Sequence, residues 1–275
     1  METLFPPFDP DDDNVRRPRL RQVRQIPIRM ILPNLITLLG LCAGLTAIRM
    51  SIEGRYGEAI GMIVLAAVLD AIDGRVARLL RSTSRFGAEL DSLADFVNFG
   101  VAPAMMLYVW ILDGARSFGW IAALIFAICA ALRLARFNVS IDGPKPDWHA
   151  NFFTGIPAPA GALVVLLPLY LDKLEVPVGV ATLPIVLVYT IVIGLFMVSR
   201  LPTWSGKKFG SRVPRDAVLP LFVVVVVVAA LLLSYPWHVL AAGAILYLAA
   251  LPFGWRLWHR YAEAERRASE SAPSP

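Results

Sequence analysis

The chain has 275 residues, of which 57% are hydrophobic and 17% are charged, and its mean hydropathy is +0.63. In a soluble domain of this length, roughly a quarter of all residues would be charged. The composition therefore excludes an ordinary soluble protein and indicates an integral membrane protein. The net charge of +5 is explained by topology and by anionic lipid headgroups, so we expect membrane lipid and no nucleic acid as a partner.

Apolar segments recur along almost the whole chain, each close to the roughly 20 residues that a helix needs to span the hydrocarbon core of a bilayer. We therefore predict an all-α fold, a polytopic membrane helical bundle with about eight transmembrane helices. The expected spans are residues 31–50, 57–80, 96–112, 119–137, 155–171, 181–199, 217–234 and 237–258. Glycines spaced four apart, Gly40 with Gly44 and Gly57 with Gly61, predict close helix contacts within the subunit or at a dimer interface.

The two ends of the chain are polar and flank a single membrane domain. We expect a basic, disordered N-terminal segment at 1–28, the membrane domain at 29–260, and a disordered tail at 261–275. Arginines and lysines gather on one set of loops and flanks, whereas the opposite loops carry few of them. By the positive-inside rule, both termini lie in the cytoplasm, and the protein is a multi-pass protein of the cell (inner, cytoplasmic) membrane.

Four aspartates stand out because they lie at the boundary between two apolar segments. They are Asp70, Asp73, Asp91 and Asp95, and ionisable residues at the edge of membrane helices are functional candidates by default. Asp70 and Asp73 are three positions apart, and Asp91 and Asp95 are four apart, so each pair shares one face of its helix. The connection 79–88 would fold the two helices back together, so that the four carboxylates converge at the depth of a lipid headgroup on the cytoplasmic side.

Four carboxylates this close together cannot all be ionised without a cation between them. Ligands that offer only oxygen suit Mg²⁺, Mn²⁺ or Ca²⁺ rather than zinc, and we expect two divalent cations, Mg²⁺ or Mn²⁺, that clamp a diphosphate. The small residues Gly74 and Ala77 leave room for a substrate close to the helix backbone, and Arg78 can reach phosphate oxygens. The pattern indicates a site for a lipid whose headgroup carries a nucleotide diphosphate.

The spacing of these residues also matches a known signature. The chain reads Asp70-x2-Asp73-Gly74-x2-Ala77-Arg78-x8-Gly87-x3-Asp91-x3-Asp95, and at every fixed position it resembles the signature of the CDP-alcohol phosphatidyltransferase family.

This resemblance implies a helical membrane enzyme, commonly a homodimer, whose active-site cavity opens to the cytoplasm. It implies that the four aspartates hold the metal pair and that Asp95 is also the general base that deprotonates the acceptor hydroxyl. The alkoxide then attacks the β-phosphorus of a CDP-linked lipid, and CMP leaves. Gly74, Ala77, Arg78 and Gly87 would contact the CDP group together with Asp73.

Segments around the signature favour one acceptor alcohol. The runs 31–37, 83–104, 131–138 and 153–159 resemble the integral-membrane CDP-diacylglycerol–serine O-phosphatidyltransferases (phosphatidylserine synthases). That resemblance implies CDP-diacylglycerol and L-serine as substrates, with phosphatidylserine and CMP as products.

Further site residues lie outside the signature. By the resemblance, Asn34 and Thr37 line the CDP pocket, although Asn34 could instead cap its helix. Near the cytoplasmic end of the fourth span, Arg133 and Arg136 could bind the carboxylate of serine, and Asn138 could take a polar contact. The alternative for the two arginines is anchoring at the cytoplasmic membrane surface.

Two other functions stay open on the residues alone. The same chemistry could use choline, glycerol 3-phosphate or an inositol phosphate as the acceptor, because two arginines on one helix also suit a phosphorylated alcohol. The four acids could instead form the ion site of a cation-coupled transporter, although the chain lacks the repeated halves that transporters often show. A transporter would need no CDP-lipid and would release no CMP.

Overall fold

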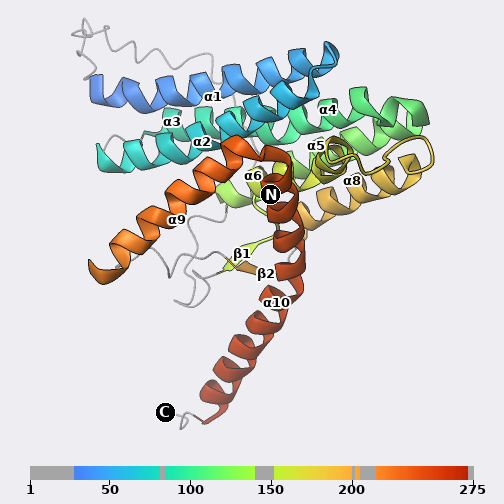
Figure 1. The fold of residues 1–275 in the computed structure, drawn as a ribbon. Helices are drawn as coiled ribbons and strands as arrows, with labels where there is room; N and C mark the ends of the chain where they lie inside the picture. The colour runs from blue at the N-terminus through green and yellow to red at the C-terminus, as the bar shows by residue number, and fades with distance from the viewer. Residues whose placement is uncertain (1–27, 81–83, 140–151, 200–201, 205–214, 272–275) are drawn as a thin grey trace, which may run out of the picture.

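The computed structural model describes residues 28–80, 84–139, 152–199, 202–204 and 215–271. Within these ranges the chain is helical apart from one pair of short antiparallel strands, which agrees with the predicted all-α fold (Figure 1). The predicted N-terminal segment 1–28 lies almost entirely outside the described residues.

The elements follow one another in chain order with short connections between most of them. They are α1 (Ile28–Ile52), α2 (Tyr56–Leu79), α3 (Arg85–Asp95), the π-helical turn η1 (Phe96–Val101), α4 (Ala102–Trp110), the 3₁₀ turn η2 (Leu112–Ala115), α5 (Ser117–Val139), β1 (Phe152–Thr154), α6 (Ala158–Val165), α7 (Leu167–Lys173), α8 (Leu183–Val198), β2 (Pro202–Trp204), α9 (Arg215–Ser234) and α10 (Pro236–Ser271).

Several of these helices are long and apolar enough to cross a membrane. In the described ranges they are Ile31–Ile52, Arg85–Trp110, Ser117–Val139 and Pro236–Gly254, while Leu183–Val198 and Val218–Ser234 are apolar but shorter. A membrane protein is therefore supported, and the total of about eight spans stays a prediction.

Two predicted spans have different boundaries in the structure. The third helix begins at Arg85 rather than at residue 96, because the Ser84 side chain caps it by accepting a hydrogen bond from the Gly87 amide. The segment 155–171 is divided into α6 and α7. Pro168 lies at the break, and a proline has no N–H to continue the hydrogen-bond ladder of a helix.

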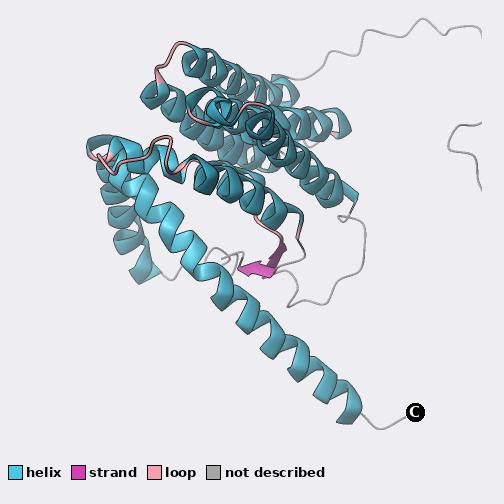
Figure 2. Cartoon of the chain, turned by 90° about the vertical axis from the view of Figure 1, so that its right-hand side faces the viewer, coloured by secondary structure: helices cyan, strands magenta, loops and turns pink. Residues whose placement is uncertain are grey.

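The predicted disordered tail 261–275 also differs from the structure, because α10 continues as a helix to Ser271. Residues 261–271 are rich in alanine, glutamate and arginine, which are strong helix formers. Figure 2 shows α10 projecting away from the rest of the bundle. The β1–β2 pair lies beside this helix (Figure 1).

The core of the bundle lies between helices that pack lengthwise. α1 packs most extensively against α2, and α5 packs against α8. Phe99 from η1, Phe126 from α5 and Tyr170 from α7 are among the largest fully buried side chains. By contrast, the valines 223–228 of α9 are all exposed, as side chains facing lipid would be.

The start of α6 depends on one glycine. Gly155 has φ +78° in the left-handed region, where residues with a Cβ are disfavoured. A Cβ at this position would overlap the carbonyl oxygen of Met197 and lie 3.0 Å from that of Ser199. Glycine therefore allows the strand β1 to turn into α6 against the end of α8.

We expect Gly155→Ala to lower the thermal unfolding midpoint of the purified protein in detergent. The left-handed backbone alone costs about 1–2 kcal/mol for a residue with a Cβ, and the overlap with Met197 adds to it. Gly61→Ala in α2 is the matched control, because a Cβ there meets nothing within 4 Å. Equal midpoints for the two variants would contradict this account of the turn.

Candidate active site

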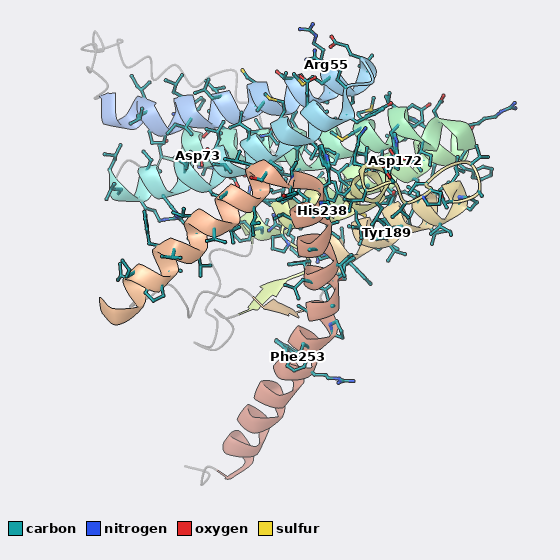
Figure 3. The ribbon with its side chains drawn as sticks, in the orientation of Figure 1. Arg55, Asp73, Asp172, Tyr189, His238 and Phe253 are labelled. Atoms are coloured by element: carbon teal, nitrogen blue, oxygen red, sulfur yellow. The ribbon has the colours of Figure 1, made fainter. Side chains whose placement is uncertain are left out.

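The four aspartates lie on two helices that meet at one end of the bundle. Asp70 and Asp73 lie toward the end of α2, and Asp91 and Asp95 lie on α3. In Figure 3, Asp73 lies well away from Arg55, which marks the turn between α1 and α2. The 18 residues from Arg55 to Asp73 correspond to about 27 Å of helix at 1.5 Å per residue.

Three of the four carboxylates form a tight cluster. One oxygen each from Asp70, Asp91 and Asp95 lie within 4.8 Å of one another, and all three residues are half-buried. The side chains of Asp70 and Asp95 also interact directly with each other. Three carboxylates in this space repel one another unless protons or cations are shared between them. A cluster that offers only oxygen suits Mg²⁺ or Mn²⁺.

Asp73 faces a different partner. It is 4% exposed, and its Oδ2 accepts a hydrogen bond of 2.7 Å from the hydroxyl of Thr37 on α1. The predicted group of four ligands is thus arranged as a cluster of three with Asp73 beside it. Asp91 interacts electrostatically with both Asp70 and Asp73, so it joins the two parts.

A cavity of about 190 Å³ lies between the start of α1, the end of α2 and the start of α3. All seven residues that the sequence predicted for the CDP group line it. The full lining is Pro33, Asn34, Thr37, Asp73, Gly74, Ala77, Arg78, Ser84, Gly87, Ala88 and Asp91. Sequence reasoning missed Pro33 and Ala88, which are adjacent to predicted residues, and Ser84, which lies three residues before Gly87; none of the three carries a distinctive signal. The CDP-binding role of the seven stays a prediction.

Gly87 allows α1 and α3 to approach closely at this cavity. A Cβ on Gly87 would lie 2.9 Å from Oδ1 of Asn34 and 3.1 Å from Oγ of Ser84. A Cβ here would therefore require the Asn34 and Ser84 side chains to move. The glycine of the signature thus shapes the wall of the cavity.

The three residues predicted for the acceptor lie near the end of α5 but have different surroundings. Arg133 is half-buried and interacts electrostatically with Asp70 and Asp95, and its guanidinium carbon lies 5.5 Å from the ring centroid of Phe137. Its charge thus lies beside the carboxylate cluster.

The other two predicted residues are exposed and tie α5 to its neighbours. Arg136 donates a hydrogen bond to the carbonyl oxygen of Val198 at the end of α8. Asn138 donates one of 2.9 Å to Oγ of Ser92, which lies next to Asp91 on α3. Of these three residues, Arg133 is the one that interacts with the carboxylate cluster.

Two residues near the cluster were not predicted from the sequence. Tyr247 of α10 interacts electrostatically with Arg133, but nothing in the last apolar segment marks this tyrosine. Asn98 in η1 is 2% exposed and lies about one turn after Asp95. This residue could have been found from the sequence, because a polar residue inside an apolar span has an unfavourable free energy of burial and therefore marks a functional candidate.

Comparisons with known proteins identify one family. The family model described as CDP-alcohol phosphatidyltransferase matches residues 30–192, and one described as CDP-alcohol phosphatidyltransferase 2 matches residues 216–252. The first match contains every residue of the cavity and of the carboxylate cluster.

Individual relatives are similar over most of the chain. A CDP-diacylglycerol–serine O-phosphatidyltransferase from Mycobacterium leprae is 40% identical over 239 residues, which cover 86% of this chain and 77% of that protein. A protein of the same name from Helicobacter pylori is 34% identical over 79% of this chain and 88% of its own length. An archaetidylserine synthase from Methanothermobacter thermautotrophicus is 36% identical over 52% of this chain and 59% of its own length.

The family model covers more than half of the chain, and the bacterial relatives align with most of it. The chain belongs to the CDP-alcohol phosphatidyltransferase family.

Proposed function

We propose that this protein transfers the phosphatidyl group of CDP-diacylglycerol to the hydroxyl of L-serine, with phosphatidylserine and CMP as products. The observation that carries the proposal is the cavity between α1, α2 and α3, which all seven predicted CDP-binding residues line and which Asp91 connects to the carboxylate cluster. The names of the bacterial relatives support serine as the acceptor.

The donor would bind with its CDP group in the cavity and its acyl chains in the surrounding lipid. Thr37 on α1 and Arg78 on α2 both line the cavity, each from a different helix. A guanidinium binds phosphate oxygens strongly because it offers several charged N–H donors. Gly74 and Ala77 leave the backbone of α2 accessible, so the diphosphate can lie close to the helix.

Two divalent cations, Mg²⁺ or Mn²⁺, would be held by Asp70, Asp73, Asp91 and Asp95. Such ions, when bound, neutralise the charge that a diphosphate and four carboxylates bring together. The donor set fits them, because the clustered side chains offer oxygen atoms and no sulfur or imidazole nitrogen.

Asp95 would take the proton of the serine hydroxyl, and Arg133 would hold the serine carboxylate beside it. As the proton moves to the Asp95 carboxylate, the serine oxygen forms a bond to the β-phosphorus of the donor. The bond from this phosphorus to the oxygen that bridges to CMP breaks, and CMP leaves with that oxygen. The electrostatic interaction of Arg133 with Asp95 supports the pairing of these two roles.

The active site would face the cytoplasm, in a homodimer that crosses the cell membrane with about eight helices and has both termini inside. The distribution of arginine and lysine along the sequence supports this orientation. The exposed apolar side chains of α9 support contact with lipid.

Asp95→Asn should reduce the turnover number by at least about a hundredfold, because a general base typically contributes this much or more. The measurement is CMP release by purified protein given CDP-diacylglycerol, Mn²⁺ and L-serine. Binding of the donor should be largely retained, since the amide has nearly the shape of the carboxylate. An active Asp95→Asn enzyme would remove Asp95 from the role of base.

Removal of divalent cations with EDTA should abolish CMP release, and Mn²⁺ or Mg²⁺ should restore it.

Asp91→Asn should weaken Mn²⁺ binding by at least about tenfold, because even residues beyond the direct ligands usually change metal affinity this much. Electron paramagnetic resonance of Mn²⁺ titrations reads binding without turnover. Glu89→Gln is the control, an exposed acid on the same helix; equal affinities of the two variants would argue against a metal at the cluster.

Arg133→Gln should raise the KM for L-serine by at least about tenfold, because a hydrogen bond to a charged group is worth about 1.5–3 kcal/mol. The KM for CDP-diacylglycerol serves as the internal control and should change little. Arg133→Lys should lie between the wild type and Arg133→Gln, since it keeps the charge but loses the planar fork. A rise in the donor KM alone would assign Arg133 to the donor instead.

A further inference from the structure

A buried amide lies directly beyond the proposed base. Asn98 is 2% exposed, although it lies inside an apolar span, and its Oδ1 has no hydrogen-bond partner among the described residues. A buried polar atom without a partner is destabilising. Such a group is informative because packing alone would favour an apolar side chain at this position.

Asn98 also belongs to an unusual stretch of backbone. It lies in η1, where the Ala102 amide donates to the carbonyl oxygen of Val97, five residues earlier. Pro103 has no N–H to donate to Phe99, and its ring disfavours a regular helix at that point, which explains the wider turn. The π-helical turn begins at the residue after Asp95. It therefore sets how the helix with Asp91 and Asp95 is rotated relative to the buried α4.

The Asn98 side chain packs against the glycine face of α1. A Cβ on Gly44 would overlap Oδ1 of Asn98 and lie 3.0 Å from its Cγ, and a Cβ on Gly40 would lie 3.6 Å from its Nδ2. The predicted close contact of Gly40 and Gly44 is thus made within the subunit. Because Thr37, Gly40 and Gly44 are three and four residues apart, they share one face of α1.

This face of α1 makes one hydrogen bond and one packing contact with the aspartate-bearing helices. Thr37 donates to Asp73 on α2, and Gly44 receives Asn98 from the helix of Asp95. The same helix contributes Asn34 and Thr37 to the donor cavity. A shift of α1 against η1 would therefore move the donor cavity relative to Asp95.

We propose that Asn98 is a positioning residue that holds Asp95 in register with the donor-binding face of α1. The proposal rests on the function proposed above, in which Asp95 is the base. It requires the amide itself, and not only the volume that the amide fills against Gly44. Misplacement of a reacting group by about 1 Å can reduce a rate by about a hundredfold, so small shifts of this contact are sufficient to impair turnover.

Two substitutions test the effect of the amide group separately from the effect of the volume that the side chain fills. Asn98→Ala removes the side chain, and Gly44→Ala places a methyl group in the space that Asn98 occupies. The double variant Gly44→Ala/Asn98→Ala relieves the overlap and refills the contact without an amide. Ser51→Ala on α1 is the control, a buried hydroxyl that donates only to its own helix at Ala47. Each full-length protein is assayed for CMP release with L-serine and for its thermal midpoint in detergent.

The double variant should recover a thermal midpoint close to the wild type while its kcat stays at least about tenfold lower, with the KM for CDP-diacylglycerol within about twofold. Asn98→Ser, which keeps a small polar group, should recover part of the kcat. Ser51→Ala should leave kcat unchanged. Recovery of kcat in the double variant would overturn the proposal, because packing alone would then be sufficient. A donor KM that rises in step with the loss of kcat would also overturn it.

Different results would contradict the proposed function and this inference. If Asp95→Asn is active, Asp95 is not the base, whatever the Asn98 variants do. If Asp95→Asn is inactive and Gly44→Ala/Asn98→Ala is fully active, the base is retained and the positioning role of Asn98 is rejected.

Discussion

The mutual repulsion of the carboxylates near the ends of α2 and α3 is the constraint on which the site depends. Asp70, Asp91 and Asp95 bring oxygen atoms within 4.8 Å of one another in a half-buried region. Such a cluster is stable only if its charge is offset, and Arg133 of α5 supplies one positive charge against three. The remaining negative charge makes the cluster suitable for divalent cations, which the proposed function requires.

The packing of α1 gives this cluster a cavity beside it. α1 approaches α3 at Gly87 and η1 at Gly44, two positions where a Cβ would meet the neighbouring side chain. Between these contacts, Thr37 holds the buried Asp73. The glycines therefore let one helix approach both the cavity and the helix that carries Asp95.

Sequence reasoning predicted the composition of the site better than its arrangement. Five of the seven residues predicted for the CDP group belong to the signature, and Asn34 and Thr37 were predicted from a resemblance outside it; in the structure all seven line one cavity. Sequence reasoning did not predict that Asp73 would pair with Thr37 apart from the other three acids, because this depends on how α1 lies against α2. Nor did it predict η1, whose wide turn follows from Pro103 only once the helix is known to continue through it. The partner of Arg136, the carbonyl of Val198, lies 62 residues away in the chain, which no local pattern could have indicated.

The central claim is that the cavity and the carboxylate cluster together transfer a phosphatidyl group to serine. The most direct test gives purified wild-type protein CDP-diacylglycerol and Mn²⁺ with L-serine, glycerol 3-phosphate, choline or an inositol phosphate, and identifies the lipid product by mass spectrometry. The account predicts phosphatidylserine and an equal amount of CMP with L-serine alone. A lipid product with another acceptor only would contradict the acceptor assignment. No product with any acceptor, from protein shown to be folded, would contradict the transferase account itself.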